Sequence, residues 1–123
     1  MCERAVTDQQ GIPGWIDNHC HLGHGSADDE LLTRARDCGV VGFIDVAVDL
    51  DSARNCLAAA AREPDVWATA GLHPHSASSG TEGLAELVEA NLGGGELVAI
   101  GERGLDFHYD NSPRAVQRAV FRR

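Results

Sequence analysis

The chain has 123 residues, of which 43% are apolar and 24% charged, as in an ordinary globular domain. Its formal net charge of −9 excludes a basic nucleic-acid clamp, and no apolar run approaches the roughly 18–20 residues that span a bilayer. The first residues lack the apolar core of a secretory signal, so the four cysteines indicate free thiols. We therefore expect a cytoplasmic protein without a membrane-spanning segment.

The first predicted elements are a strand and a helix. Residues 1–14 are polar and lack periodicity, which predicts a loose lead-in. A short strand is expected to begin at Trp15 and to run into the motif that ends at His21. A helix over about 28–38 follows, with Gly39 as its C-terminal stop.

A continuous apolar run at 40–47 predicts the second strand, buried on both faces as in a parallel sheet. An Ala-rich helix then begins at Asp51 or Ser52 and extends to about Arg62. Pro64 prevents a longer helix because proline removes a backbone donor and clashes with the preceding turn.

The second half of the chain repeats this alternation. Strands are expected at 66–71 and 97–101, separated by a loop at 72–80 and a helix over 82–92. A last helix begins at Ser112-Pro113, since proline suits the first helical turn, and the sequence ends inside it.

Alternating strands and helices predict an α/β protein with a parallel sheet. Two architectures fit this order: an open doubly wound sheet, or part of an eight-stranded barrel. A complete barrel needs about 250 residues, roughly twice the length of this chain.

Polar side chains alternate along the end of the first predicted strand. Alternate residues of a strand share one face, so Asp17, His19 and His21 are expected to point the same way. Two imidazoles at this spacing can converge on one metal ion, and such a polar row is costly unless something satisfies it. The alternative is an exposed strand end at which the histidines have no role.

A second polar motif, His73-Pro74-His75, follows the third predicted strand. Folds of the α/β class place their sites in loops at this end of the strands. The imidazoles could bind a metal ion or, when protonated, an anionic substrate. Two exposed loop histidines without a function fit the same residues.

The third motif follows the fourth predicted strand. Gly101 and Gly104 allow a sharp exit from the strand and hold Glu102 at its end. A carboxylate there can bridge metal ions or act as a base. Asp106, in the same loop, is interpreted as a loop or capping residue.

Parallel strands bring their carboxyl ends to one rim, so the three motifs are expected to form one site. Its candidate residues are His19, His21, His73, His75 and Glu102.

In this order, the motifs resemble the TatD family of metal-dependent deoxyribonucleases, one of the amidohydrolase-like barrels. The matching segments are Trp15–Leu22, Gly71–His75 and Ala99–Asp110, followed by Ser112–Arg114 and Gln117. The resemblance implies that residues 15–123 form the first half of a (β/α)8 barrel, four parallel βα units with the last helix truncated.

The resemblance also implies a divalent metal centre at the C-terminal rim, with Mg, Mn or Zn as the ion and two ions in the full-length barrel. His19 and His21 resemble the paired ligands of one metal, and Glu102 the catalytic carboxylate that contacts or bridges the metals. His73 resembles a residue near the substrate phosphate, and we place His75 beside it on the substrate side. The implied reaction is hydrolysis of a phosphodiester of DNA, which the acidic chain could meet through its metal ions.

The sequence departs from the family's pattern at Asn18, Gly23 and Arg103, and the family's later His and Asp ligands have no counterpart. We therefore expect weak metal binding, little or no nuclease activity from this chain, and self-association through the open edges of the sheet. Two alternatives remain at this stage. One is another amidohydrolase-like hydrolase acting on an amide or lactone, and the other is a non-catalytic metal-binding fragment.

Overall fold

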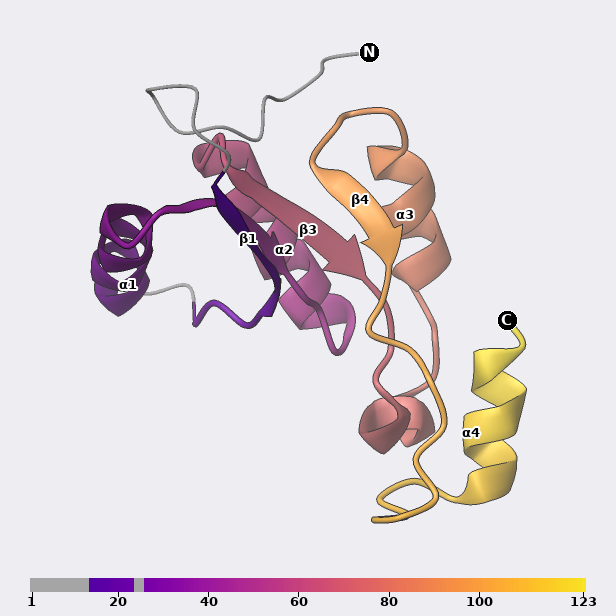
Figure 1. Ribbon diagram of the computed structural model, residues 1–123. Helices are drawn as coiled ribbons and strands as arrows, with labels where there is room; N and C mark the ends of the chain where they lie inside the picture. The colour runs from indigo at the N-terminus through magenta and orange to yellow at the C-terminus, as the bar shows by residue number, and fades with distance from the viewer. Residues whose placement is uncertain (1–13, 24–25) are drawn as a thin grey trace.

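The computed structural model describes residues 14–23 and 26–123. The lead-in predicted over 1–14 lies, except for Gly14, outside the described residues. Strands and helices alternate along the chain, which confirms the predicted α/β class (Figure 1). The elements are β1 (Trp15–Cys20), α1 (Ser26–Asp37), β2 (Val40–Asp45), α2 (Leu50–Arg62), β3 (Val66–Ala70), the 3-10 helix η1 (Pro74–Ser79), α3 (Leu84–Asn91), β4 (Leu97–Ile100) and α4 (Arg114–Phe121).

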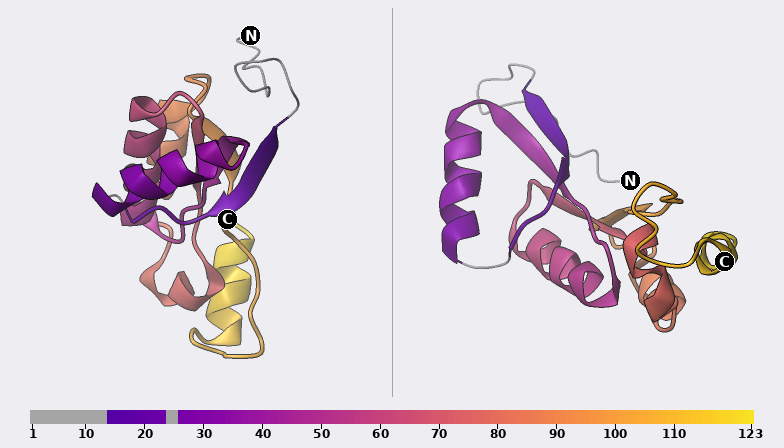
Figure 2. Two further views of the ribbon diagram at one scale, coloured as in Figure 1. Left: turned by 60° about the vertical axis from the view of Figure 1, so that its left-hand side comes forward. Right: turned by 90° about the horizontal axis from the view of Figure 1, so that it is seen from below.

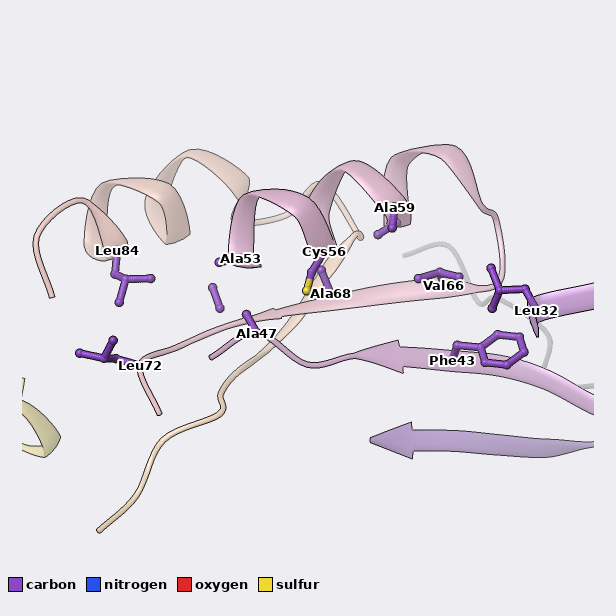
Figure 3. Close-up of a cluster of buried hydrophobic side chains, with 12 residues drawn as sticks. Leu32, Phe43, Ala47, Ala53, Cys56, Ala59, Val66, Ala68, Leu72 and Leu84 are labelled. Carbon is purple, nitrogen blue, oxygen red and sulfur yellow. The ribbon is translucent and has the colours of Figure 1, made fainter. Parts of the chain in front are cut away.

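The four strands form one parallel sheet in the order β1-β2-β3-β4. Because crossovers between parallel strands are right-handed, an order that advances in one direction places the crossover helices on the same face. Figure 3 shows this for α2 and α3, whose side chains approach the sheet from one side. The arrangement is that of a barrel segment, since a doubly wound sheet reverses its order and carries helices on both faces.

The core lies between α2 and the two middle strands (Figure 3). Small side chains on the inner face of α2, Ala53, Cys56 and Ala59, are at most 1% exposed. They allow the helix to lie close to β3, where Val66 and Ala68 are fully buried. Close packing of this kind is sensitive to a change of even one methylene group.

The start of α2 differs from the prediction. Asp49, not Asp51 or Ser52, caps the helix: its carboxylate accepts the Ser52 N–H at 2.8 Å, and the Ser52 hydroxyl accepts the Asp49 N–H at 2.9 Å. β2 ends at Asp45, two residues earlier than predicted, so the helix can begin earlier as well. Ser52 therefore occupies the third helical position of a capping box.

The predicted loop at 72–80 contains a helical turn that the sequence reading missed. η1 begins at Pro74, and His73 caps it by accepting the His75 N–H at 3.1 Å. The next helix, α3, begins at Leu84 rather than 82, after Gly83 in a left-handed conformation with φ of 79°.

The helix ends marked by glycine and proline are confirmed. α1 ends at Asp37, and Gly39 follows with φ of 90°. α4 begins directly after Pro113. Among the helices that the structure describes, none is long and apolar enough to cross a membrane.

The last helix, α4, lies beyond the sheet and next to η1, as Figure 1 and the left view of Figure 2 show. A cavity of about 300 Å³, lined by Leu84, Val88 and Val120 among others, is found between α3 and α4. Gln117, on the inner side of α4, is only 1% exposed. A polar residue at this buried position requires hydrogen-bond partners, which the loop after β4 provides.

Candidate metal centre

Three of the predicted site residues converge at the carboxyl ends of the strands. The ligand atoms of His19, His21 and Glu102 lie within 4.8 Å of one another. His19 belongs to β1 and Glu102 follows β4, the two outer strands of the sheet. In a flat sheet these strands would be roughly 14 Å apart, and side chains would stand perpendicular to it. The convergence therefore reflects curvature of the sheet, as in a barrel wall.

His19 at the end of β1 and His21 directly after the strand lie side by side, with ring centroids 5.1 Å apart. Asp17, predicted to share their face, is not part of the cluster, because its carboxylate accepts the His19 N–H at 3.2 Å. Cys20 lies between His19 and His21 in the sequence, and its thiol donates to the Ile44 carbonyl at 3.4 Å. Burial raises the pKa of the Cys20 thiol to about 12, so it remains protonated at neutral pH and is a poor ligand.

The partner of His21 determines which ring nitrogen is available. Its Nδ1 lies 2.8 Å from the carbonyl oxygen of Val46. A carbonyl can only accept, so Nδ1 carries the proton and Nε2 presents its lone pair to the cluster. Histidines that bind metals in proteins are commonly held by such a second hydrogen bond.

Glu102 lies between two histidines. Its Oε2 is 3.4 Å from His19 Nε2, and its Oε1 is 3.4 Å from His73 Nε2. Backbone bonds hold this part of the chain, because the Glu102 N–H donates to the Ala47 carbonyl at 2.7 Å and the Gly101 N–H to the Ala70 carbonyl at 2.9 Å. The carboxylate is thus placed by the two middle strands of the sheet.

The two histidines of the second motif have different surroundings. His73 Nδ1 accepts the His75 N–H, so its Nε2 carries the proton and faces Glu102. His75 turns instead to Asp106, and its Nε2 forms a short contact with that carboxylate. His73 is therefore adjacent to the cluster, while His75 is one ring farther out, at a centroid distance of 4.5 Å from His73.

Asp106 has a larger role than the capping function predicted for it. Its Oδ1 accepts the N–H groups of His108 and Tyr109, and together with His75 these bonds lower the pKa of the Asp106 carboxyl. It stays ionised and holds His75 in one orientation.

The buried hydrogen bonds of Gln117 and Ser112 that hold this loop were not predicted from the sequence. The Gln117 side chain accepts the Asp106 N–H at 2.7 Å and donates to the carbonyls of Asp106 at 2.8 Å and Ser112 at 2.7 Å. The Ser112 hydroxyl, fully buried, donates to the His75 carbonyl at 2.8 Å. The sequence does contain a sign of these bonds: Gln117 lies three residues before Val120, on the side of α4 that carries the apolar residues.

Comparisons with known proteins identify the family of the chain. The family model described as TatD related DNase matches residues 16–123. A protein named 3'-5' ssDNA/RNA exonuclease TatD from Cronobacter sakazakii is 39% identical over 93 residues, which are 76% of this chain and 35% of that protein. The protein of the same name from Edwardsiella piscicida is 40% identical over 93 residues, 75% of this chain and 36% of its own length.

A solved structure is also similar. The crystal structure of YjjV, a TatD homologue from Escherichia coli K12, superposes with a TM-score of 0.74 at 30% identity. The superposition covers 88% of this chain and 44% of YjjV, so the sheet described above matches part of a TatD barrel. The match to the exonucleases covers about a third of their length. On the family match, which includes all three motifs, the chain belongs to the TatD-related DNase family.

Proposed function

We propose that this chain carries part of the divalent-metal centre of a nuclease that hydrolyses phosphodiester bonds of DNA. The observation that carries the proposal is the convergence of His19, His21 and Glu102 within 4.8 Å. The names of the relatives, exonucleases acting on single-stranded DNA and RNA, support the same reaction class. We further propose that residues 15–123 correspond to the N-terminal half of such a barrel, supported by the 44% of YjjV that the chain matches.

The donor set fits a divalent ion. His19 and His21 would hold it through their ring nitrogens and Glu102 through its carboxylate, a mixture of imidazole and oxygen ligands that suits Mn or Zn and, with more oxygen donors, Mg. The Nδ1 bond of His21 to Val46 keeps its Nε2 available for this role. When bound, such an ion lowers the pKa of a coordinated water and offsets the charge on the phosphate.

The chain's own residues supply the remaining steps. Glu102 is positioned to accept the proton of the attacking water, since its carboxylate lies among the proposed ligands. His73, with a protonated Nε2 3.4 Å from Glu102, is positioned to donate to a phosphate oxygen. His75 extends the substrate side from its contact with His73, held in place by Asp106.

Metal binding tests the proposal directly. We expect the chain to bind Mn²⁺ weakly in calorimetric titration, because the described residues bring three ligands together. His19→Asn and His21→Asn should each weaken binding by at least about tenfold. His108→Asn is the matched control, because it changes an exposed histidine outside the cluster. Wild-type affinity in a His19→Asn/His21→Asn double variant would overturn the proposed ligand set.

Cleavage of a labelled single-stranded oligonucleotide with Mg²⁺ or Mn²⁺ tests the activity of the chain itself. We expect little or no product, since the same three ligands are all that the described residues assemble. Robust cleavage that Glu102→Gln abolishes would contradict the low activity and support the role of Glu102. Robust cleavage that Glu102→Gln leaves intact would contradict both.

A further inference from the structure

Three aromatic rings lead outward from the proposed metal centre. His73 lies against Glu102, the ring centroid of His75 is 4.5 Å from that of His73, and the centroid of Tyr109 is 5.7 Å from that of His75. Successive rings meet edge to face, with interplanar angles of 79° and 85°. Tyr109 is 69% exposed, and one further ring, that of His108, meets it edge to face at a centroid distance of 4.6 Å. An exposed aromatic ring in contact with a site histidine offers a face for a flat ligand.

Positive charge is concentrated in the same part of the chain. Residues 103–123 hold five of the ten basic residues and only two acidic ones, a local net charge of +3 in a chain of net charge −9. All five are arginines, whose planar guanidinium groups match phosphate geometry and stack on aromatic rings. An anionic partner is therefore attracted to this segment and repelled by most of the remaining surface.

The arginines of α4 are joined to the loop that carries Tyr109. The guanidinium groups of Arg114 and Arg118 lie 4.9 Å and 5.2 Å from the centroid of the Phe107 ring. Arg114 also donates to the Phe107 carbonyl at 2.9 Å and pairs with Asp110 at 2.7 Å, so its charge is already balanced. Arg118 is exposed, and within the described part of the chain it has no carboxylate at ion-pair distance.

We infer that Tyr109 and Arg118 form a docking surface for single-stranded nucleic acid: an unpaired base stacks on Tyr109, and a backbone phosphate contacts Arg118. The inference rests on the proposed function, because the surface extends the path of the strand away from the metal centre. Every base has a face that can stack on an aromatic ring, but in a duplex those faces are already covered. The surface therefore favours unpaired strands without reading their sequence.

Binding without cleavage tests the stacking contact. We would measure the fluorescence anisotropy of a short labelled oligothymidylate, in EDTA so that no metal contributes. Tyr109→Leu should weaken binding by about tenfold, whereas Tyr109→Trp should preserve it because the larger ring still stacks. Trp15→Leu is the matched control, since Trp15 is also a highly exposed aromatic residue, at 77%, but begins β1 at the opposite end of the sheet. It should leave binding unchanged.

Salt dependence tests the phosphate contact. Each phosphate contact to a single strand adds about 0.7 to the slope of log K against log salt, so Arg118→Gln should reduce the slope by about that amount. Arg54→Gln, which changes an exposed arginine on α2 paired with Asp51, should not alter it. A slope unchanged in Arg118→Gln would overturn the role of Arg118.

Three other results would overturn the surface: no binding of the oligonucleotide by the wild-type chain, wild-type affinity in Tyr109→Leu, or equal affinity for the same sequence annealed to its complement. Mn²⁺ titration of these variants separates this failure from failure of the proposed function, because neither residue is a proposed ligand. If His19→Asn loses Mn²⁺ binding but binds the oligonucleotide normally in EDTA, the docking surface works independently of the metal centre, as we expect.

Discussion

The middle strands and the outer strands of the sheet differ in burial and in chemistry. In β2 and β3, Phe43 is 3% exposed and Val66 fully buried. In β1 and β4, Trp15 is 77% and Ile100 50% exposed. Yet the three proposed ligands lie at the ends of the outer strands: His19 in β1, His21 directly after it, and Glu102 shortly after β4. The comparison indicates that folding stability is concentrated in the middle of the sheet and the proposed chemistry at its edges, so substitutions should separate the two.

The outer strands are nevertheless positioned by the middle of the sheet. The segment after β2 contacts both halves of the cluster: the Val46 carbonyl bonds His21 Nδ1, and the Ala47 carbonyl accepts the Glu102 N–H. Thr69, buried in β3, joins the same region, since its hydroxyl accepts the Ala47 N–H at 3.1 Å and donates to the Gly101 carbonyl at 2.6 Å. A change in the middle of the sheet can therefore reach the cluster when it moves this backbone.

The largest expected effect is a loss of folding stability when an aromatic residue of the middle strands, but not one of the outer strands, is truncated. Phe43→Ala should lower the free energy of unfolding by about 3–5 kcal/mol, because it leaves a cavity among buried neighbours. Trp15→Ala should lower it by no more than about 0.5 kcal/mol, since most of that side chain is in solvent. Urea denaturation followed by far-UV circular dichroism measures both. If Phe43→Ala does not fold, Phe43→Leu provides a smaller cavity, and equal losses in the two regions would break the comparison.

A smaller effect is expected where the middle of the sheet meets the cluster. A Cβ on Gly71 would lie 2.5 Å from the Gly101 carbonyl carbon and 2.8 Å from the Glu102 carbonyl oxygen. Since these are backbone atoms, Gly71→Ala must displace the segment that carries Glu102, at a cost of about 1–3 kcal/mol. Mn²⁺ titration should show weaker binding, whereas Gly104→Ala, which meets open space, should bind normally. Unchanged Mn²⁺ affinity in Gly71→Ala would show that the carboxylate does not depend on this packing.

Much of the fold could be predicted from the sequence because its signals are local. The apolar run at 40–47, the alanines of α2 and the stop at Gly39 each act within a few residues, and the order of strands and helices follows from them. Errors occurred where neighbours decide the outcome. Asp49 caps α2, in place of the predicted residues, because β2 ends before its apolar run does. The helical turn η1 was not predicted because its cap is the side chain of His73, an uncommon capping residue.

The candidate site could be predicted only in part. The alternation of His19 and His21 and the position of Glu102 after a strand placed them at one rim, and the structure brings these three together. Local sequence patterns carry no information about the curvature of the sheet, which brings the ends of β1 and β4 close together. They also do not show that the His75 ring faces Asp106. Whether these residues bind metal and substrate remains a prediction.

The smallest expected effect concerns the cap of α2, in the middle region. Asp49→Ala should lower the free energy of unfolding at neutral pH by about 1 kcal/mol, because the Ser52 N–H loses its acceptor. The bonds from Ser52 lower the pKa of Asp49. Its contribution is therefore complete above the ordinary value of about 3.9 and is lost as the pH falls through the lower, folded value.

The difference in stability between wild type and Asp49→Ala should accordingly shrink when urea denaturation is repeated at progressively lower pH below about 4. Asp49→Asn retains a capping oxygen without the charge and should lose less stability at neutral pH. Mn²⁺ affinity should be unchanged in both variants, because the bonds that hold His21 and Glu102 run to Val46 and Ala47, before the helix begins. A cap variant that weakens Mn²⁺ binding would mean that α2, and not only the strand end, sets the position of the cluster.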